Sequence, residues 1–189
     1  MPIFSDLSRC IEQANEYKPV GKLAEFYGEY YSPYYAFFIK AMAIPGVRHP
    51  KVAVELGVDQ GRGLISLAYG GGNGCRVYGI DHTLKDRTQI AINMFNNITF
   101  LQTNSNPPPG EIPDGIYLLH IDTEHSYSQA ETEFEAYKPK LAKNAIVVFD
   151  DLHAQDDSVL EYFMSLPYPK IQDDRMHPTC GWGVMLYNE

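Results

Sequence analysis

The sequence predicts an α/β protein, built on a mostly parallel sheet with helices on both faces. From residue 51 onward, short apolar runs alternate with helical stretches, and continuous apolar runs are typical of strands buried on both faces. The chain has 189 residues, which is enough to bury a core without disulfide staples. We therefore expect a single domain over residues 1–189, with an N-terminal helical cap at 1–46 and an α/β core at 51–189.

The N-terminal segment is expected to be helical over residues 5–43. Ser32 and Pro33 are typical of an N-cap followed by proline in the first helical turn. Tyrosine and phenylalanine are concentrated between residues 27 and 38. These rings could pack the helices onto the sheet, line a pocket over its edge or form a dimer contact. The sequence leaves a homo-oligomer open.

Strands and helices alternate through the core in a fixed order. Strands are predicted at 51–56, 76–80, 98–102, 115–121, 145–149, near 170 and at 183–187. Helices are predicted from the glycine turn to about 69, at 87–95, at 126–141 and at 156–165. Three strands end in an acid, namely Asp81, Asp122 and Asp150. Because ligands of open α/β sheets bind at the carboxyl ends of strands, these acids mark the expected site.

The charge balance and the cysteines limit the expected partners. There are 15 basic and 24 acidic side chains, a net charge of −9, and no run of Lys or Arg. This predicts that neither nucleic acid nor a membrane is a partner. The chain has no apolar stretch near 18 residues, and we expect its N-terminal segment not to be a signal peptide. Its three widely spaced cysteines, Cys10, Cys75 and Cys180, suit reduced thiols in a cytoplasmic protein.

A glycine-rich turn follows the first predicted strand. Glu55, Gly57 and Gly61 form the pattern E-x-G-x-x-x-G, in which Asp59 replaces a glycine of the dinucleotide fingerprint. Asp81 ends the next strand, where such folds place an acid on ribose hydroxyls. The pattern resembles the first motif of class I S-adenosylmethionine-dependent methyltransferases. That resemblance implies that Glu55, Gly57, Gly61 and Asp81 bind the cofactor; the alternative is that the glycines serve only packing.

Three carboxylates are expected to gather at the carboxyl ends of the fourth and fifth strands. Asp122 follows the fourth strand, and Asp150 and Asp151 follow the fifth. Clustered carboxylates repel one another unless a cation neutralises them. Oxygen ligands of this kind suit a hard ion such as magnesium. The alternative for Asp150 and Asp151 is a pair of helix-capping acids.

Two further motifs follow the fourth and fifth strands, namely I-D-x-x-H-S-Y at 121–127 and V-F-D-D-x-H at 148–153. Together with the glycine turn, they resemble the motifs of the metal-dependent O-methyltransferases called methyltransferase family 24. Relatives include methyltransferases of cephalosporin pathways and of macrolide sugars. The resemblance covers about 51–153, and 181–187 resembles the closing strand. It implies a Rossmann-like three-layer sandwich whose seven-stranded sheet has an antiparallel last strand.

The same resemblance assigns residue roles. It implies that Asp122, Asp150 and Asp151 hold the metal and that His125 acts as the base. The alternative for His125 is that it only caps the turn. Many relatives carry Gly-Asp-Ser after the third strand, where this chain has Thr-Asn-Ser. The adenine contact is therefore expected from the amide of Asn104.

The expected activity is methyl transfer from S-adenosylmethionine to a hydroxyl of a small-molecule acceptor, such as a sugar or a natural-product intermediate. A divalent metal is expected to assist the transfer, and Mg²⁺ is the expected ion. Two alternatives stay open. One is a metal-dependent hydrolase on the same fold, in which the glycine turn is idle. The other is a non-catalytic binding protein that uses its aromatic helices as an interface.

Overall fold

The computed structural model describes residues 2–45, 51–156 and 158–188. Its strands form one sheet in the order β3-β2-β1-β4-β5-β7-β6. They are β1 (Lys51–Leu56), β2 (Cys75–Asp81), β3 (Ile98–Gln102), β4 (Ile116–Ile121), β5 (Leu141–Asp150), β6 (Lys170–Gln172) and β7 (Trp182–Tyr187). Only β7 runs antiparallel to its neighbours. The predicted seven-stranded sheet with an antiparallel last strand is confirmed.

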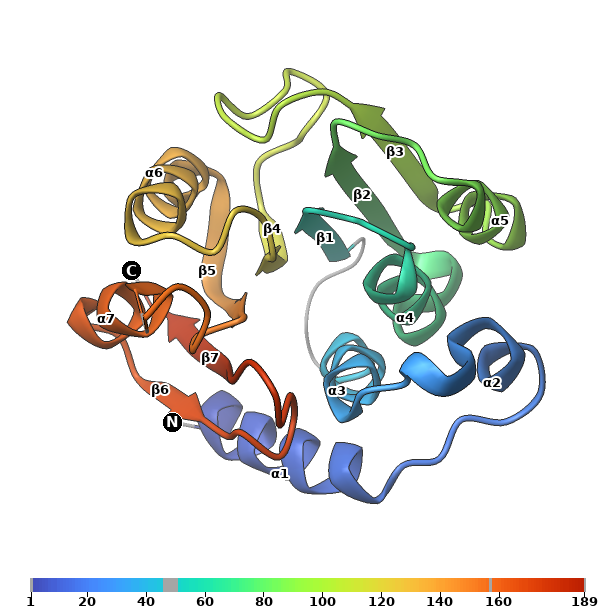
Figure 1. Ribbon diagram of the computed structural model, residues 1–189, viewed down its shortest axis with the longest axis horizontal. Helices are drawn as coiled ribbons and strands as arrows, with labels where there is room; N and C mark the ends of the chain where they lie inside the picture. The colour runs from blue at the N-terminus through green and yellow to red at the C-terminus, as the bar shows by residue number, and fades with distance from the viewer. Residues whose placement is uncertain (1, 46–50, 157, 189) are drawn as a thin grey trace.

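Helices cover both faces of this sheet and give three layers (Figure 1). They are α1 (Pro2–Glu16), α2 (Gly21–Tyr27), α3 (Pro33–Met42), α4 (Arg62–Gly71), α5 (Asp86–Met94), α6 (Tyr127–Tyr137) and α7 (Ser158–Ser165). Short 3₁₀ turns lie at η1 (Gly28–Tyr30), η2 (Gly72–Gly74) and η3 (Lys138–Lys140). Helices α6 and α7 lie on one face, and α1 to α5 on the other. The helical N-terminus is confirmed, and the expected junction with the core at 46–50 lies outside the described residues.

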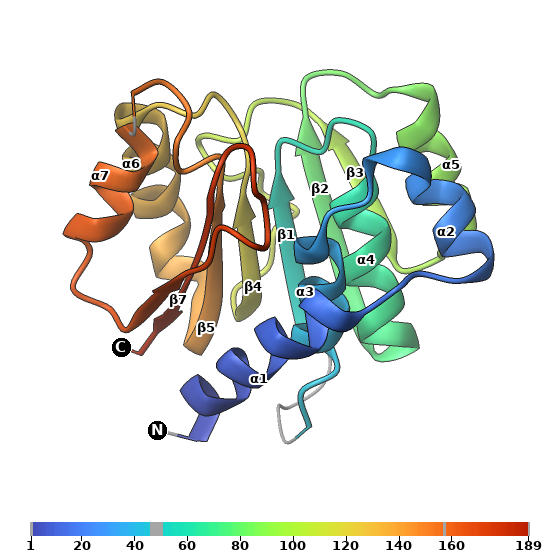
Figure 2. The same cartoon turned by 60° about the horizontal axis from the view of Figure 1, so that its bottom comes forward.

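The strands are buried on both faces, as their continuous apolar runs predict. In β1, Ala53 packs with the α1–α5 layer, and Val52 and Val54 pack with the α6–α7 layer. The parallel strands point toward the same edge of the sheet, where the loops that follow them gather (Figure 2). Within the part of the chain that the structure describes, no helix is long and apolar enough to cross a membrane.

The aromatic residues of the N-terminal segment mostly pack inside the protein. Tyr27 stacks on Tyr35 with 5.3 Å between ring centroids, and Phe37 meets Trp182 of β7 edge-on at 4.8 Å. Tyr30 is the exception, with 63% of its surface exposed. The rings thus attach α2 and α3 to the core.

One predicted boundary is wrong. The helix expected at 126–141 ends at Tyr137, and β5 begins at Leu141, four residues before the expected start at 145. Pro139 lies in the intervening 3₁₀ turn η3. Because proline has no backbone N–H to donate, it cannot continue a helix, and the chain turns into the strand early.

Candidate active site

A cavity of about 810 Å³ opens at the carboxyl edge of β1, β2 and β4. This volume is in the range of small-molecule sites. Predicted site residues that line it are Gly57, Asp81, Asn104, Asp122, His125 and Asp151. The other predicted residues, Glu55, Gly61 and Asp150, do not line this cavity. The sheet edge therefore brings most of the expected cofactor and metal residues to one cavity.

Only glycine fits at the first position of the glycine turn, because a side chain there would collide with the protein's own backbone. Gly57 has φ +81°, and a Cβ there would lie 1.8 Å from the carbonyl oxygen of Asp122. The amide of Gly57 donates to the carbonyl of Ile80 at 2.9 Å. Gly61 also has positive φ, but it faces α5, where a Cβ would lie 3.2 Å from the Cα of Thr88. Gly61 thus packs closely against α5, and its contact with the cofactor stays a prediction.

We expect Gly57→Ala to abolish cofactor binding and to lower the melting temperature more than Gly115→Ala does. Gly115 has φ +84° with no atom within 4 Å of its Cβ position, so it controls for backbone strain alone. That strain costs roughly 1–2 kcal/mol, and only Gly57→Ala adds a clash with a backbone oxygen. Calorimetry and thermal melts check this; equal losses in both variants would contradict it.

Asp81 organises the glycine turn and also lines the cavity. Its Oδ2 accepts hydrogen bonds from the amides of Val58 and Asp59, both at 3.0 Å, and its Oδ1 accepts from the amide of Thr83 at 3.0 Å. Lys85 pairs with Asp59 at the cavity wall. Asp81 therefore fixes the turn's backbone at the place where a ribose is expected to bind.

Glu55 lies beneath the turn rather than in the main cavity. It is 2% exposed, and its Oε1 lies 3.0 Å from Nδ1 of His120. Burial raises the pKa of Glu55 to about 7, and the hydrogen bond with His120 opposes this shift. Among the residues that the structure describes, its Oε2 has no hydrogen-bond partner, and Glu55 lines a polar cavity of about 90 Å³ together with Tyr34 and Arg62.

The acids Asp122, Asp150 and Asp151 converge, with imidazoles between them. Nε2 of His125 lies 3.2 Å from Oδ1 of Asp122 and 3.1 Å from Oδ2 of Asp151. Nδ1 of His177 lies 2.8 Å from Oδ1 of Asp150. Burial, and then the charge of Asp150, raise the pKa of Asp122 above its usual value. This carboxylate is thus poorly stabilised when ionised.

The geometry does not unite all three acids in one set of ligands. Among the described residues, candidate ligand atoms within 4.8 Å of one another join Asp122 and Asp150 with His120, and Asp122 and Asp151 with His125. Asp122 is common to both sets. A single ion held by all three acids would require small side-chain rotations.

Three histidines carry raised pKa values at this cluster: His120, His125 and His177. The hydrogen bond with Asp122 is the main cause for His125, although burial opposes it. Burial lowers the pKa of His177, but the hydrogen bond and charge of Asp150, with the charge of Asp151, outweigh it. Sequence reasoning missed His177, since it follows no strand end and belongs to no recognisable motif.

Glu133 is a further residue that sequence reasoning missed. It is fully buried and accepts hydrogen bonds from Ser105 Oγ at 2.5 Å, Thr123 Oγ1 at 2.7 Å and Gln129 Nε2 at 2.8 Å. These three donors line the main cavity. A signal existed, because Glu133 shares the apolar face of α6 with Phe134, and an acid on such a face needs polar partners.

Solved structures with the same fold include several methyltransferases. Cofactor-bound Rv0187 from MTB has a TM-score of 0.65 and 15% identity, over 100% of this chain and 91% of that one. The O-methyltransferase TomG from Streptomyces achromogenes, in complex with SAM, has a TM-score of 0.61 and 13% identity, over 97% and 90%. An rRNA methylase from Streptococcus thermophilus has a TM-score of 0.60 and 16% identity, over 80% and 92%. These likenesses establish the fold.

The exclusion of nucleic acid as a partner is wrong, because the same fold serves an rRNA methylase. The net charge led to the wrong prediction, since it sums over the whole surface and does not describe the charge at the site.

A comparison of the sequence with curated proteins gives no match. A family model described as a methyltransferase domain matches residues 54–152, which span the glycine turn and all three acids. The chain belongs to this methyltransferase family, in the class I S-adenosylmethionine-dependent group that its motifs predict.

Proposed function

We propose that the protein transfers the methyl group of S-adenosylmethionine to a hydroxyl of a small molecule, such as a sugar or a natural-product intermediate, with a divalent ion at the acid cluster. The observation that carries this proposal is the position of Asp122 and Asp151, which line the same cavity as Asp81 and Asn104. Within the described residues, no Lys or Arg forms an ion pair with Asp122, Asp150 or Asp151.

The cofactor side of the cavity is formed by Asp81 and Asn104. S-adenosylmethionine, when bound, supplies an activated methyl group. The Asp81 carboxylate can accept hydrogen bonds from ribose hydroxyls, and the Asn104 amide can pair with a nucleobase edge. Glu133 supports this side, since its hydrogen bonds to Ser105 and Thr123 fix two segments of the wall.

The acid side fits a divalent ion by its donor set. Asp122, Asp150 and Asp151 offer carboxylate oxygens, which are the ligands that Mg²⁺ prefers. A divalent ion held there would supply positive charge beside the acceptor hydroxyl and lower the pKa of that hydroxyl. The raised pKa of Asp122 supports the same assignment, because burial first and the charge of Asp150 second disfavour its ionised form, which a bound cation would stabilise.

His125 is the candidate general base. Its Nε2 faces Asp122 and Asp151 at the cavity wall. An imidazole at this place can take the proton of an acceptor hydroxyl as the oxygen attacks the methyl group. The neighbouring carboxylates stabilise the imidazolium that results.

We expect Mg²⁺ affinity to fall as the pH is lowered from 8 to 5. Asp122 must lose its proton to bind a metal, and its pKa lies above the usual value of about 3.9. Protons therefore compete with the ion at a higher pH than they would for an ordinary aspartate. Isothermal titration calorimetry across this range checks the prediction, and an affinity that stays constant down to pH 5 would contradict it.

The proposed function is tested with methyl-tritiated S-adenosylmethionine and a panel of acceptors that includes sugars, phenols and rRNA. Methylation of a hydroxyl-bearing small molecule, stimulated by Mg²⁺ and lost in EDTA, is the expected result. Methylation that is unaffected by EDTA would refute metal assistance. Labelling of RNA with no labelling of small molecules would refute the acceptor class.

A further inference from the structure

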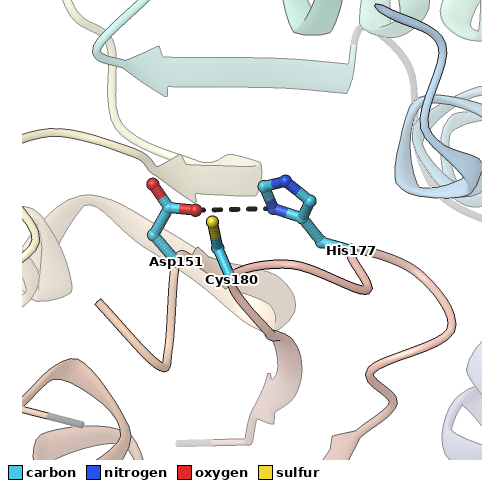
Figure 3. A group of neighbouring side chains, drawn as sticks. All are labelled: Asp151, His177 and Cys180. Carbon is cyan, nitrogen blue, oxygen red and sulfur yellow. Dashed lines mark ion pairs between the residues drawn. The ribbon is translucent and has the colours of Figure 1, made fainter. Parts of the chain in front are cut away.

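A third group of side chains that could hold a metal ion lies at the acid cluster: Asp151, His177 and Cys180 (Figure 3). One ligand atom from each lies within 4.8 Å of the other two. Nδ1 of His177 and Oδ1 of Asp151 are 3.4 Å apart. A tetrahedral zinc ion holds its ligands at about 2.0–2.3 Å, so the ligand atoms of one ion lie roughly 3.3–3.8 Å apart. The three side chains can therefore converge on one ion after small rotations.

The backbone already holds these residues together. His177 and Cys180 lie on one turn of the loop before β7, where the amide of Gly181 donates to the carbonyl of His177 at 2.9 Å. The carbonyl of Cys180 accepts from the amide of His153 at 2.7 Å, which ties the loop to the segment that carries Asp151. The ligand-bearing segments are thus joined by hydrogen bonds, so little ordering is needed to bind an ion.

The donor set differs in chemistry from the all-oxygen magnesium site. It combines a carboxylate, an imidazole and a thiol, and thiolate ligands favour borderline ions such as Zn²⁺ over Mg²⁺. Three protein ligands leave a fourth position of a tetrahedral ion open, as in catalytic zinc sites. Cys180 is partly exposed, whereas Cys10 and Cys75 are buried, so its thiol is accessible to an incoming ion.

We propose that Asp151, His177 and Cys180 form a binding site for Zn²⁺ or a similar thiophilic divalent ion. Asp151 belongs to both this site and the proposed magnesium site, whereas Asp122 belongs only to the latter. The proposal does not depend on methyl transfer, because it concerns metal binding by the free protein.

The test uses Co²⁺, which accepts the same ligand types and reports a thiolate ligand by a charge-transfer absorption band. Wild-type protein titrated with Co²⁺ should show this band, and Zn²⁺ should abolish it by displacement. Cys180→Ser should lack the band, and His177→Ala should bind Co²⁺ at least tenfold more weakly. The double variant Cys10→Ala/Cys75→Ala should keep it, as the matched control for the other thiols.

A second measurement needs no variant. Zn²⁺ should protect Cys180 of the wild-type protein from alkylation by iodoacetamide, as mapped by mass spectrometry. Absence of the cobalt band, or its persistence in Cys180→Ser, would overturn the proposal, and so would unprotected Cys180 at saturating Zn²⁺. Asp122→Asn should keep the cobalt band while losing Mg²⁺ binding, so failure of this site and failure of the proposed function are distinguishable.

Discussion

Replacing His125 by alanine is expected to lower the turnover of methyl transfer by roughly 10²–10⁴-fold, the usual contribution of a general base. The acceptor is whichever member of the panel the wild-type protein methylates. Nε2 of His125 lies 3.2 Å from Asp122 and 3.1 Å from Asp151, and His125 lines the main cavity, so loss of the ring removes the candidate proton acceptor beside these acids. Steady-state kinetics at saturating cofactor and Mg²⁺ check this.

The same histidine could instead be a metal ligand, because one of its nitrogens lies within 4.8 Å of ligand atoms of both Asp122 and Asp151. His125→Gln separates the roles, since its amide can hydrogen-bond to Asp122 but cannot accept the proton. If His125 is the general base, both variants lose turnover and keep their affinity for Mg²⁺. Near-wild-type turnover in either variant would remove His125 from the mechanism, and a matching loss of Mg²⁺ affinity would make it a ligand.

The second large effect is expected for Asp122→Asn, which keeps the side-chain shape and removes the charge common to both acid sets. Mg²⁺ at 100 times its Kd should stabilise the wild-type protein by about 2.7 kcal/mol. For a chain of this length, that corresponds to a rise in Tm of roughly 5–10 °C. Asp122→Asn should lose this rise, and its methyl transfer should fall to the level of the wild-type protein in EDTA.

The matched control is Asp114→Asn, which also removes one negative charge but at an exposed position paired with Lys140. It should keep the full Mg²⁺-dependent rise in Tm. A rise that survives in Asp122→Asn would place the ion elsewhere on the protein. A rise lost in both variants would mean that overall charge, rather than a site, attracts the ion.

The sequence predicts the sheet well because its signals are local. Continuous apolar runs define the strands, and acids at strand ends, such as Asp81 and Asp122, define the functional edge. The position of Glu55 was harder to foresee, since its carboxylate turns beneath the helix to meet His120 rather than facing the main cavity. Side-chain direction at a strand end depends on how neighbouring strands pack, which a motif does not specify.

Contacts between segments that are distant in the chain could not be predicted from the sequence. His177 meets Asp150 only because β7 inserts beside β5 and carries its preceding loop to the sheet edge. Gly57 shows the same limit: the motif predicts a glycine there, but not that a Cβ at this position would collide with the carbonyl oxygen of Asp122. Local patterns thus locate the site, and tertiary pairing decides which groups meet there.

The most direct test of a metal-assisted methyltransferase site is a crystal structure with S-adenosylhomocysteine and Mn²⁺, whose anomalous scattering locates the ion. We expect the nucleoside in the 810 Å³ cavity against Asp81 and Asn104, and the anomalous peak among Asp122, Asp150 and Asp151. S-adenosylhomocysteine bound outside this cavity, or an ion that does not touch Asp122, would contradict the proposed site.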